Sequence, residues 1–227
     1  MDSLNLTPFI LSCKLAIITT LILFIFSIPF AWYLSQTKSK LKPLLESFIA
    51  LPIVLPPSVI GFYLLIVFSQ NSPIGSFFKQ TFDIQLVFNF HSLVIASCFY
   101  SLPFMVQPLQ GGFESINKNI LEASYIAGKS KFITMIKVAL PNIKPAILTA
   151  IIITFAHTIG EFGVVLMIGG SIPGETKVAS IAIYEMVEIM DYTTAHIYSA
   201  IMLIISFLIL IIVYSFNKQY KKQIGKF

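Results

Sequence analysis

The sequence contains no arginine and few charged residues of any kind. Charged side chains make up 11% of its 227 residues, against roughly 25% in a typical soluble domain. Hydrophobic residues make up 56%, and the mean hydropathy is +0.87. A soluble helical core would need polar helix faces, and the apolar runs have almost none. The composition therefore excludes an ordinary soluble domain and indicates an integral membrane protein.

Patterns for reactive or metal-binding sites are also scarce. Cys13 and Cys98 fall inside apolar runs and the three histidines are scattered, so no metal-ligand spacing and no catalytic site is predicted. The segment Gly169–Thr176 resembles a phosphate-binding loop, but Glu175 stands where such a loop requires lysine. We therefore expect no ATP site in this chain. Lysines beside lipid account for the net charge of +5, so no nucleic-acid partner is predicted.

Five apolar runs are long enough to cross a bilayer, for which about 20 residues are needed. They are Pro8–Tyr33, Leu45–Phe68, Phe90–Leu109, Ile143–Ile168 and Ala195–Phe216. The first is too long for a cleavable signal peptide and lacks a basic start, so we expect it to remain as a permanent span. Little chain is left for a soluble domain. The sequence therefore predicts one all-α membrane domain over residues 1–227, with about five transmembrane helices.

The lysines predict the orientation of these runs. Twelve of the fifteen would lie on one side of a five-span protein, whereas Lys79 and Lys177 fall on the other side and Lys14 lies within the first run. Short loops rich in lysine stay in the cytoplasm. We therefore expect the N-terminus outside, the C-terminus in the cytoplasm, and residues 111–142 as a cytoplasmic loop. The twelve are Lys38, Lys40, Lys42, Lys118, Lys129, Lys131, Lys137, Lys144, Lys218, Lys221, Lys222 and Lys226.

This loop carries a spaced motif. It reads Glu-Ala-Ser-Tyr-Ile-Ala-Gly up to Gly128, followed after nine residues by Val138 and then by Leu140-Pro141. The spacing resembles the "EAA" loop of ABC-importer permeases, with mild departures at Ser124 and Val138. In that family the loop contacts an ATPase subunit, so the resemblance implies a type I importer fold, and a chain that moves solute while its partner uses ATP and Mg. The residues it assigns to coupling are Glu122, Ala123, Ser124, Ile126, Ala127, Gly128, Leu140 and Pro141.

The residues of the loop also predict its local structure. The stretch Ile116–Lys137 is typical of two short helices separated at Gly128, which can adopt a turn conformation that other residues avoid. Small residues around Ala123 permit close approach to another protein. Phe132, Met135 and Ile136 give the second helix an apolar face. The alternative is an ordinary amphipathic surface loop.

A second resemblance concerns the substrate. Leu51–Leu65, Gly160–Gly163 with its continuation through Ile172–Thr176, and Ile181–Tyr184 are similar to molybdate ABC-transporter permeases. Phe155–Ile159 replaces the arginine-bearing stretch of that family, and sulfate permeases share parts of the pattern. The resemblance implies import of molybdate or tungstate, with sulfate as the alternative. It also implies a homodimer in the cell membrane, two ATPase subunits and an extracytoplasmic molybdate-binding protein.

Two groups of residues are candidates for the translocation path. Pro52, Pro56 and Pro57 must kink or break their helix, and carbonyls freed in a bilayer require protein or a watery cavity. The first candidates are therefore Pro56, Pro57 and Ser58, unless the kink only shapes packing. The second group consists of Thr154, His157, Thr158 and Glu161, whose spacing of i, i+3, i+4 and i+7 places them on one helix face. Of these, Thr154, Thr158 and Glu161 are the path candidates.

Glu161 is an unexpected residue in a path for an anion, and it also suggests an alternative function. Ionised, it would repel a divalent oxyanion, so we expect it to pair with a neighbour, stay protonated or lie near the outer interface. Glu161 and His157 could instead serve a stand-alone secondary transporter or channel driven by an ion gradient. On the outer side, Thr176–Tyr192 is expected to form a short helix whose acidic side chains are solvated or dock the binding protein; these are Glu185, Glu188 and Asp191.

Overall fold

The computed structural model describes the backbone of residues 5–224 and the side chains of residues 5–211, and this part of the chain is helical without strands. Three helices are long and apolar enough to cross a membrane: α1 (Thr7–Gln36), α5 (Phe90–Glu114) and the Tyr192–Ile211 part of α12 (Tyr192–Ile224). Two bent helix pairs raise the number to five if each is one span. The predicted all-α membrane fold is confirmed.

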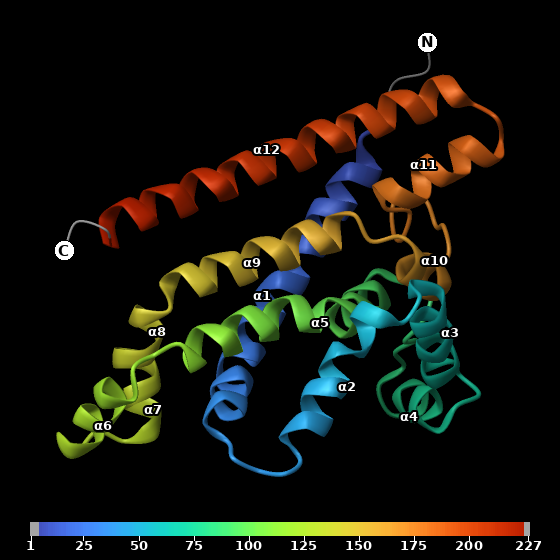
Figure 1. The fold of residues 1–227 in the computed structure, drawn as a ribbon. Helices are drawn as coiled ribbons and strands as arrows, with labels where there is room; N and C mark the ends of the chain where they lie inside the picture. Colours follow the sequence, from blue (N-terminus) through green and yellow to red (C-terminus); the bar gives the residue numbers. More distant parts are fainter. Residues whose placement is uncertain (1–4, 225–227) are drawn as a thin grey trace.

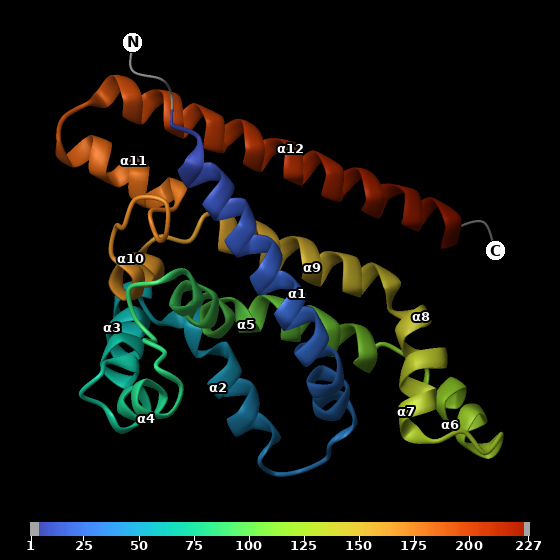
Figure 2. The same ribbon diagram turned by 180° about the vertical axis from the view of Figure 1, so that it is seen from behind.

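The centre of the bundle consists of α1, α5 and α9 (Lys144–Ile159), which pack against one another along their lengths. Figures 1 and 2 show α12 along one edge of this trio and α2 (Lys42–Val54) and α3 (Pro57–Phe68) along the opposite edge. Asn89 caps α5 by accepting a hydrogen bond from the Ser92 backbone N–H, while the Ser92 hydroxyl lies 3.3 Å from the Asn89 backbone N–H. Long helices packed in this way fix the positions of the shorter ones.

The second predicted run is broken, as its prolines indicate. Helix α2 ends at Val54 and α3 begins at Pro57, and the two are bent by 112°. Pro56 and Pro57 cannot donate to the preceding turn, so a helix cannot continue through them. The chain then forms α4 (Pro73–Phe82), a short helix that the hydropathy pattern does not predict.

The fourth predicted run, Ile143–Ile168, is wrong at its outer end. Helix α9 stops at Ile159, and a separate helix, α10 (Gly163–Gly169), follows after a break at residues 160–162. A side chain on Gly163 would come within 2.9 Å of the Pro57 Cβ, so glycine permits α10 to begin against the start of α3. The residues of the break are apolar apart from Glu161, which is why a hydropathy count does not detect it.

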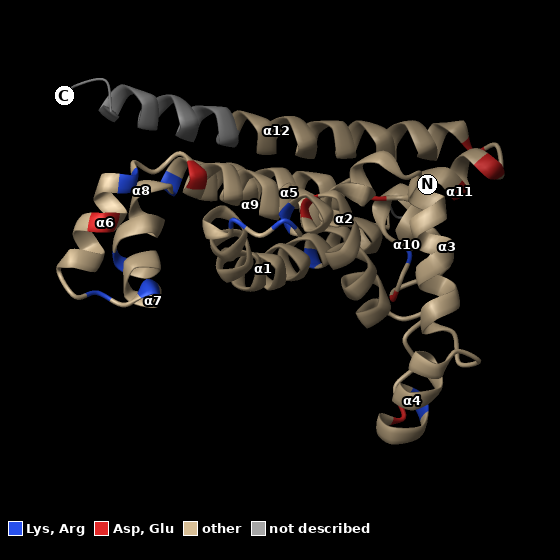
Figure 3. Ribbon diagram, turned by 60° about the horizontal axis from the view of Figure 1, so that its bottom comes forward, with Lys and Arg blue, Asp and Glu red and all other residues tan. Residues whose placement is uncertain are grey.

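The two ends of the bundle differ in structure and charge. One end carries α6 (Lys118–Ile126), α7 (Lys131–Thr134), the π-helix η1 (Met135–Ala139) and α8 (Leu140–Asn142). The other end carries α4, α10 and α11 (Ala179–Glu188), and α11 is the short helix predicted within Thr176–Tyr192. Figure 3 shows lysines gathered around α6–α8. Of the predicted cytoplasmic tail, Lys226 and the side chains of Lys218, Lys221 and Lys222 lie outside the described residues.

Candidate functional site: a two-helix projection and a cavity at the helix breaks

The loop between α5 and α9 forms the predicted pair of short helices. The Asn117 side chain caps α6 by accepting from the Asn119 N–H, and the Ser130 side chain caps α7 by accepting from the Ile133 N–H. Between them Gly128 has φ +74°, and the Lys129 N–H donates to the Ser124 carbonyl, which closes α6 in the manner of a Schellman turn. Helix α5 runs on to Glu114, so the first residues of the predicted 111–142 segment are helical and the two short helices follow them.

The two short helices are clamped together by a buried hydroxyl pair. Ser124 Oγ lies 2.8 Å from Thr134 Oγ1, and both side chains are buried. Ser124 therefore faces α7 instead of the outer surface, where the small-residue pattern places it together with Ala123 and Ala127. Ser124, one of the two departures from the motif, thus holds the two short helices together from inside.

The projection is also anchored in the membrane part of the fold. Leu121 of α6 and Met135 of η1 are buried in one apolar cluster with Phe113 of α5 and Ile143 at the start of α9. Met135, one of the residues predicted to give the second helix an apolar face, is thus part of the core. The projection is therefore packed directly against α5 and the start of α9, in the close-packed kind of interior that transmits strain.

Leu140-Pro141 turns the chain from the projection into the bundle. Proline at 141 removes a helical hydrogen bond, and the preceding residues widen into the π-helix η1. The side-chain amide of Asn142 donates to the Val138 carbonyl over 2.7 Å, which satisfies one of the carbonyls in this turn. The segments before and after Ile143 are bent by 81°.

The outward surface of the projection carries two exposed apolar side chains near its tip, on either side of the exposed Lys129 and Lys131. Ile126 is 88% exposed and Phe132 is 65% exposed, and the side chains of Glu122 and Ala123 are exposed beside them. Isolated exposed apolar residues are ordinary, but here they lie at the end of a rigid element. This arrangement suits a surface that is covered by another protein.

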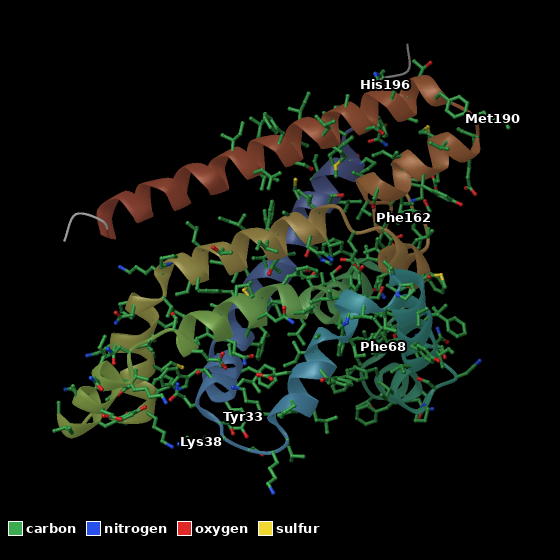
Figure 4. The ribbon with its side chains drawn as sticks, viewed as in Figure 1. Tyr33, Lys38, Phe68, Phe162, Met190 and His196 are labelled. Carbon is green, nitrogen blue, oxygen red and sulfur yellow. The ribbon has the colours of Figure 1, made fainter. Side chains whose placement is uncertain are left out.

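A cavity of about 480 Å³ lies where the two helix breaks meet. The break between α2 and α3 contributes Pro57 and Ser58, and the break between α9 and α10 contributes Gly160–Gly163. Tyr100 and His157 complete the lining. Figure 4 shows Phe162 in the segment that joins α9 to α10. The structure thus brings together Pro57, Ser58 and Glu161, three of the six residues predicted for the path.

The carboxyl group of Glu161 is buried next to this cavity. Glu161 is 4% exposed, its Oε2 accepts a hydrogen bond from the Ser97 hydroxyl of α5 over 2.7 Å, and its Oε1 has no hydrogen-bond partner. No lysine forms an ion pair with it among the described side chains. The neighbour expected for Glu161 is therefore a serine hydroxyl.

Two other members of the polar set, His157 and Thr158, also bind α5, whereas the buried Thr154 hydroxyl has no hydrogen-bond partner. The Thr158 hydroxyl donates to the Thr154 carbonyl, so the Ser101 hydroxyl donates to Thr158 Oγ1 over 2.9 Å and accepts from His157 Nδ1 at 3.0 Å. His157 stacks on Phe104 with ring centroids 3.9 Å apart. Thr154 and Thr158 are buried and do not line the cavity, and Pro56 is exposed outside it. The predicted common helix face is wrong at Glu161, which lies in the break after Ile159, and three of its four residues bond to serines of α5, namely His157, Thr158 and Glu161.

Sequence reasoning missed the two serines that complete this network. Ser97 and Ser101 are four residues apart on α5, so they lie one helical turn from each other. Polar residues at this spacing inside an apolar run are the signal that could have identified them. It also missed a cluster between α2 and α5, in which Lys42 Nζ lies 2.8 Å from Glu114 and the Gln110 amide donates to Glu114 and Glu46.

The three acidic residues of the outer segment do not form a common stripe. Glu185 pairs with Lys177 and accepts from the Ser171 hydroxyl, which closes the loop between α10 and α11. Glu188 accepts from the Tyr184 hydroxyl and raises the pKa of that phenol. Asp191 caps α12, and hydrogen bonds from Thr194 lower the pKa of its carboxyl group. Each acid has a local structural contact.

Residues 26–225 match a family model described as binding-protein-dependent transport system inner membrane component. The molybdenum transport system permease protein ModB of Azotobacter vinelandii is 45% identical over 90% of this chain and 91% of its own length. The putative molybdenum transport system permease protein YvgM of Bacillus subtilis is 33% identical over 90% of both chains. The probable sulfate transport system permease protein cysT of Chlorella vulgaris is 32% identical over 95% of this chain and 81% of its own.

Solved structures of low sequence identity share the fold. A bacterial ABC transporter involved in the import of alginate has a TM-score of 0.79 at 14% identity, with 96% of this chain and 80% of that chain covered. The inward-facing MetNI methionine ABC transporter has a TM-score of 0.73 at 15% identity, with 96% and 99% covered. The overall fold of this chain is therefore shared with these ABC transporters.

Proposed function

This chain belongs to the family of binding-protein-dependent transport system inner membrane components, and on that premise we propose that it is the permease of an ATP-driven molybdate importer. The family makes it a multi-pass membrane protein and a transport subunit rather than an enzyme. The assignment of molybdate as the substrate rests on the 45% identity to a molybdenum permease over nine-tenths of both chains. The sulfate permease is less similar, at 32%, so sulfate is the weaker candidate.

The projection of α6 and α7 is the proposed contact with the ATPase. Its exposed Ile126 and Phe132 would enter a groove on that partner, with Glu122 and Ala123 beside them. Burial of two such side chains would supply roughly 3–5 kcal/mol of apolar contact. The Ser124–Thr134 clamp and the Leu121–Met135 anchor would then pass the motion of the ATPase to α5 and α9.

The cavity at the helix breaks is the proposed part of the translocation path within one copy of the chain. Broken helices around a mid-membrane cavity are a known way to build a solute path. Two copies would place two such cavities about a common axis, with two ATPase subunits below. ATP binding would draw the projections together and open the path outward, and hydrolysis would restore the inward state.

An extracytoplasmic binding protein is the proposed source of the substrate. It would meet the end opposite the projection, where the turn between α11 and α12 presents Ile189 and Met190, 67% and 75% exposed (Figure 4). In this arrangement the N-terminus is outside and α6–α8 lie in the cytoplasm, as the lysine distribution predicts. The binding protein would set selectivity, because a path that holds a dianion tightly would not release it.

Transport by the assembled system tests this function. The chain is produced together with an ABC ATPase and a molybdate-binding protein from the same organism, and uptake of radioactive molybdate into proteoliposomes is measured. We expect uptake that requires both partners and ATP at the face that carries α6–α8. Uptake by the chain alone, driven by an imposed ion gradient, would move the assignment to a secondary transporter. Uptake of sulfate in preference to molybdate would correct the substrate and leave the permease assignment intact.

A further inference from the structure

An apolar groove of about 550 Å³ lies between α1 and α12, away from the cavity at the helix breaks. Figure 2 shows that the two helices meet near the N-terminal end of α1 and diverge toward the opposite end of the bundle. The walls of the groove consist almost entirely of aliphatic and aromatic side chains, and they include Phe9, Ile10, Cys13 and Ile17 of α1 and Ile201 and Ile205 of α12. The shape suits a long flexible hydrocarbon chain.

One charged residue, Lys14, also lines this groove. It is exposed, and it forms no ion pair with a carboxylate among the described side chains. The two other lysines near this end of the bundle differ: Lys79 pairs with Asp83 at 2.6 Å, and Lys177 pairs with Glu185. The ammonium group of Lys14 instead lies 4.6 Å from the centre of the Phe90 ring, a contact that leaves its hydrogen-bond donors available to an anion.

The depth of Lys14 places this ammonium group at the level of lipid phosphates. Helix α1 has 30 residues and is about 45 Å long, whereas the hydrocarbon core is about 30 Å thick. A centred helix would extend about 7 Å beyond the core at each end. Lys14 lies seven residues after Thr7, about 10 Å along the helix, so its Cα is only about 3 Å inside the core. A lysine side chain spans that distance and reaches the headgroups.

From the apolar groove and the lysine without a carboxylate partner we propose that this is a binding site for one anionic phospholipid. Its phosphate pairs with Lys14, and one acyl chain lies between α1 and α12. Phosphatidylglycerol is the fitting class, because the ammonium group of a zwitterionic headgroup would compete with Lys14 for the same phosphate. The site is independent of the transported substrate, since it shares no lining residue with the cavity at the helix breaks.

Native mass spectrometry of the assembled transporter measures the bound lipid directly. The transporter is supplied with phosphatidylglycerol or phosphatidylcholine of identical acyl chains. We expect the unaltered protein to retain phosphatidylglycerol about fivefold more, the effect of roughly one lysine–phosphate interaction near the membrane surface. Lys14→Met should abolish this preference, whereas the matched control Lys79→Met, which removes a lysine already paired with a carboxylate, should leave it unchanged.

Two further measurements separate the other occupants. Ile201→Trp, which fills the groove, should reduce the binding of both lipids without changing the amount of assembled transporter. Equal retention of the two lipids by the unaltered protein, or a preference that survives in Lys14→Met, would overturn the proposal. Displacement of the lipid by millimolar inorganic phosphate would reduce the site to a simple anion contact. Efficient cross-linking of Cys13 to Cys13 of a second copy by a short bismaleimide would show that a protein helix covers the groove instead.

Discussion

Substitution of Gly128 tests directly whether the projection couples transport to the ATPase. The effect of the substitution on the backbone turn can be separated from its effect on packing. Its φ of +74° lies in the left-handed region, where an L-residue costs about 1–2 kcal/mol. A Cβ at this position would meet no atom within 4 Å, so the cost within this chain is backbone strain alone. Asparagine tolerates this conformation best, alanine less well, and valine least because of its branched Cβ. Each 1.4 kcal/mol shifts the population of the native turn about tenfold.

The predicted result is a graded loss of coupled transport. With the ATPase and binding protein present, Gly128→Asn should transport nearly as the unaltered protein does, Gly128→Ala should lose a few-fold, and Gly128→Val about tenfold. The amount of chain in the membrane should stay constant across the series. Gly111→Ala is the matched control, since a Cβ there also meets no atom within 4 Å but the residue lies within α5 at an ordinary φ. Normal uptake by Gly128→Val, or an equal loss in Gly111→Ala, would refute the assigned turn.

Three further predictions concern the clamp, the topology and the energy source. Ser124→Ala or Thr134→Val alone should lower the thermal stability and the uptake, because each leaves one buried hydroxyl unpaired at a cost of about 1–3 kcal/mol. The double variant should recover part of this loss. Simple additivity in a double-mutant cycle would contradict the clamp. In a background without the native cysteines, a cysteine at the exposed Lys129 should react only from the cytoplasm and one at the exposed Glu175 only from outside; labelling of both from one side would disprove the orientation. Tungstate should compete strongly with molybdate and sulfate weakly, because the smaller sulfate leaves hydrogen-bond donors unpaired in the binding protein. Uptake of molybdate should persist when ion gradients are collapsed. A dependence of uptake on the proton gradient would point to a secondary transporter.

The two-helix structure of the projection was predictable from the sequence because local chemistry fixes it. Glycine at 128 specifies the turn, and the break at proline 141 specifies where the bundle resumes. The interior of the projection was not predictable in the same way. Whether a small residue such as Ser124 faces the partner or the neighbouring helix depends on how α6 packs on α7, and sequence spacing does not contain that information.

One of the two helix breaks could be predicted from the sequence and the other could not. Prolines 56 and 57 remove backbone donors, so the break between α2 and α3 follows from the chain alone. The break after Ile159 has no proline, and its glycines stand in an apolar context that a hydropathy window reads as one continuous helix. It becomes understandable only when Gly163 is seen against Pro57, a contact between segments about a hundred residues apart.

The buried polar set bears on the alternative of a gradient-driven transporter. That alternative requires Glu161 and His157 to exchange protons along connected hydrogen bonds. Among the described side chains the two are not hydrogen-bonded to each other, because Glu161 binds Ser97 and His157 binds Ser101. The serines lie one turn apart on α5, so both contacts fasten the outer end of α9 and the start of the break to the central helix. Buried polar groups that hold a broken helix in place need no role in proton transfer, and this agrees with the proposal that the energy for transport enters at the projection of α6 and α7.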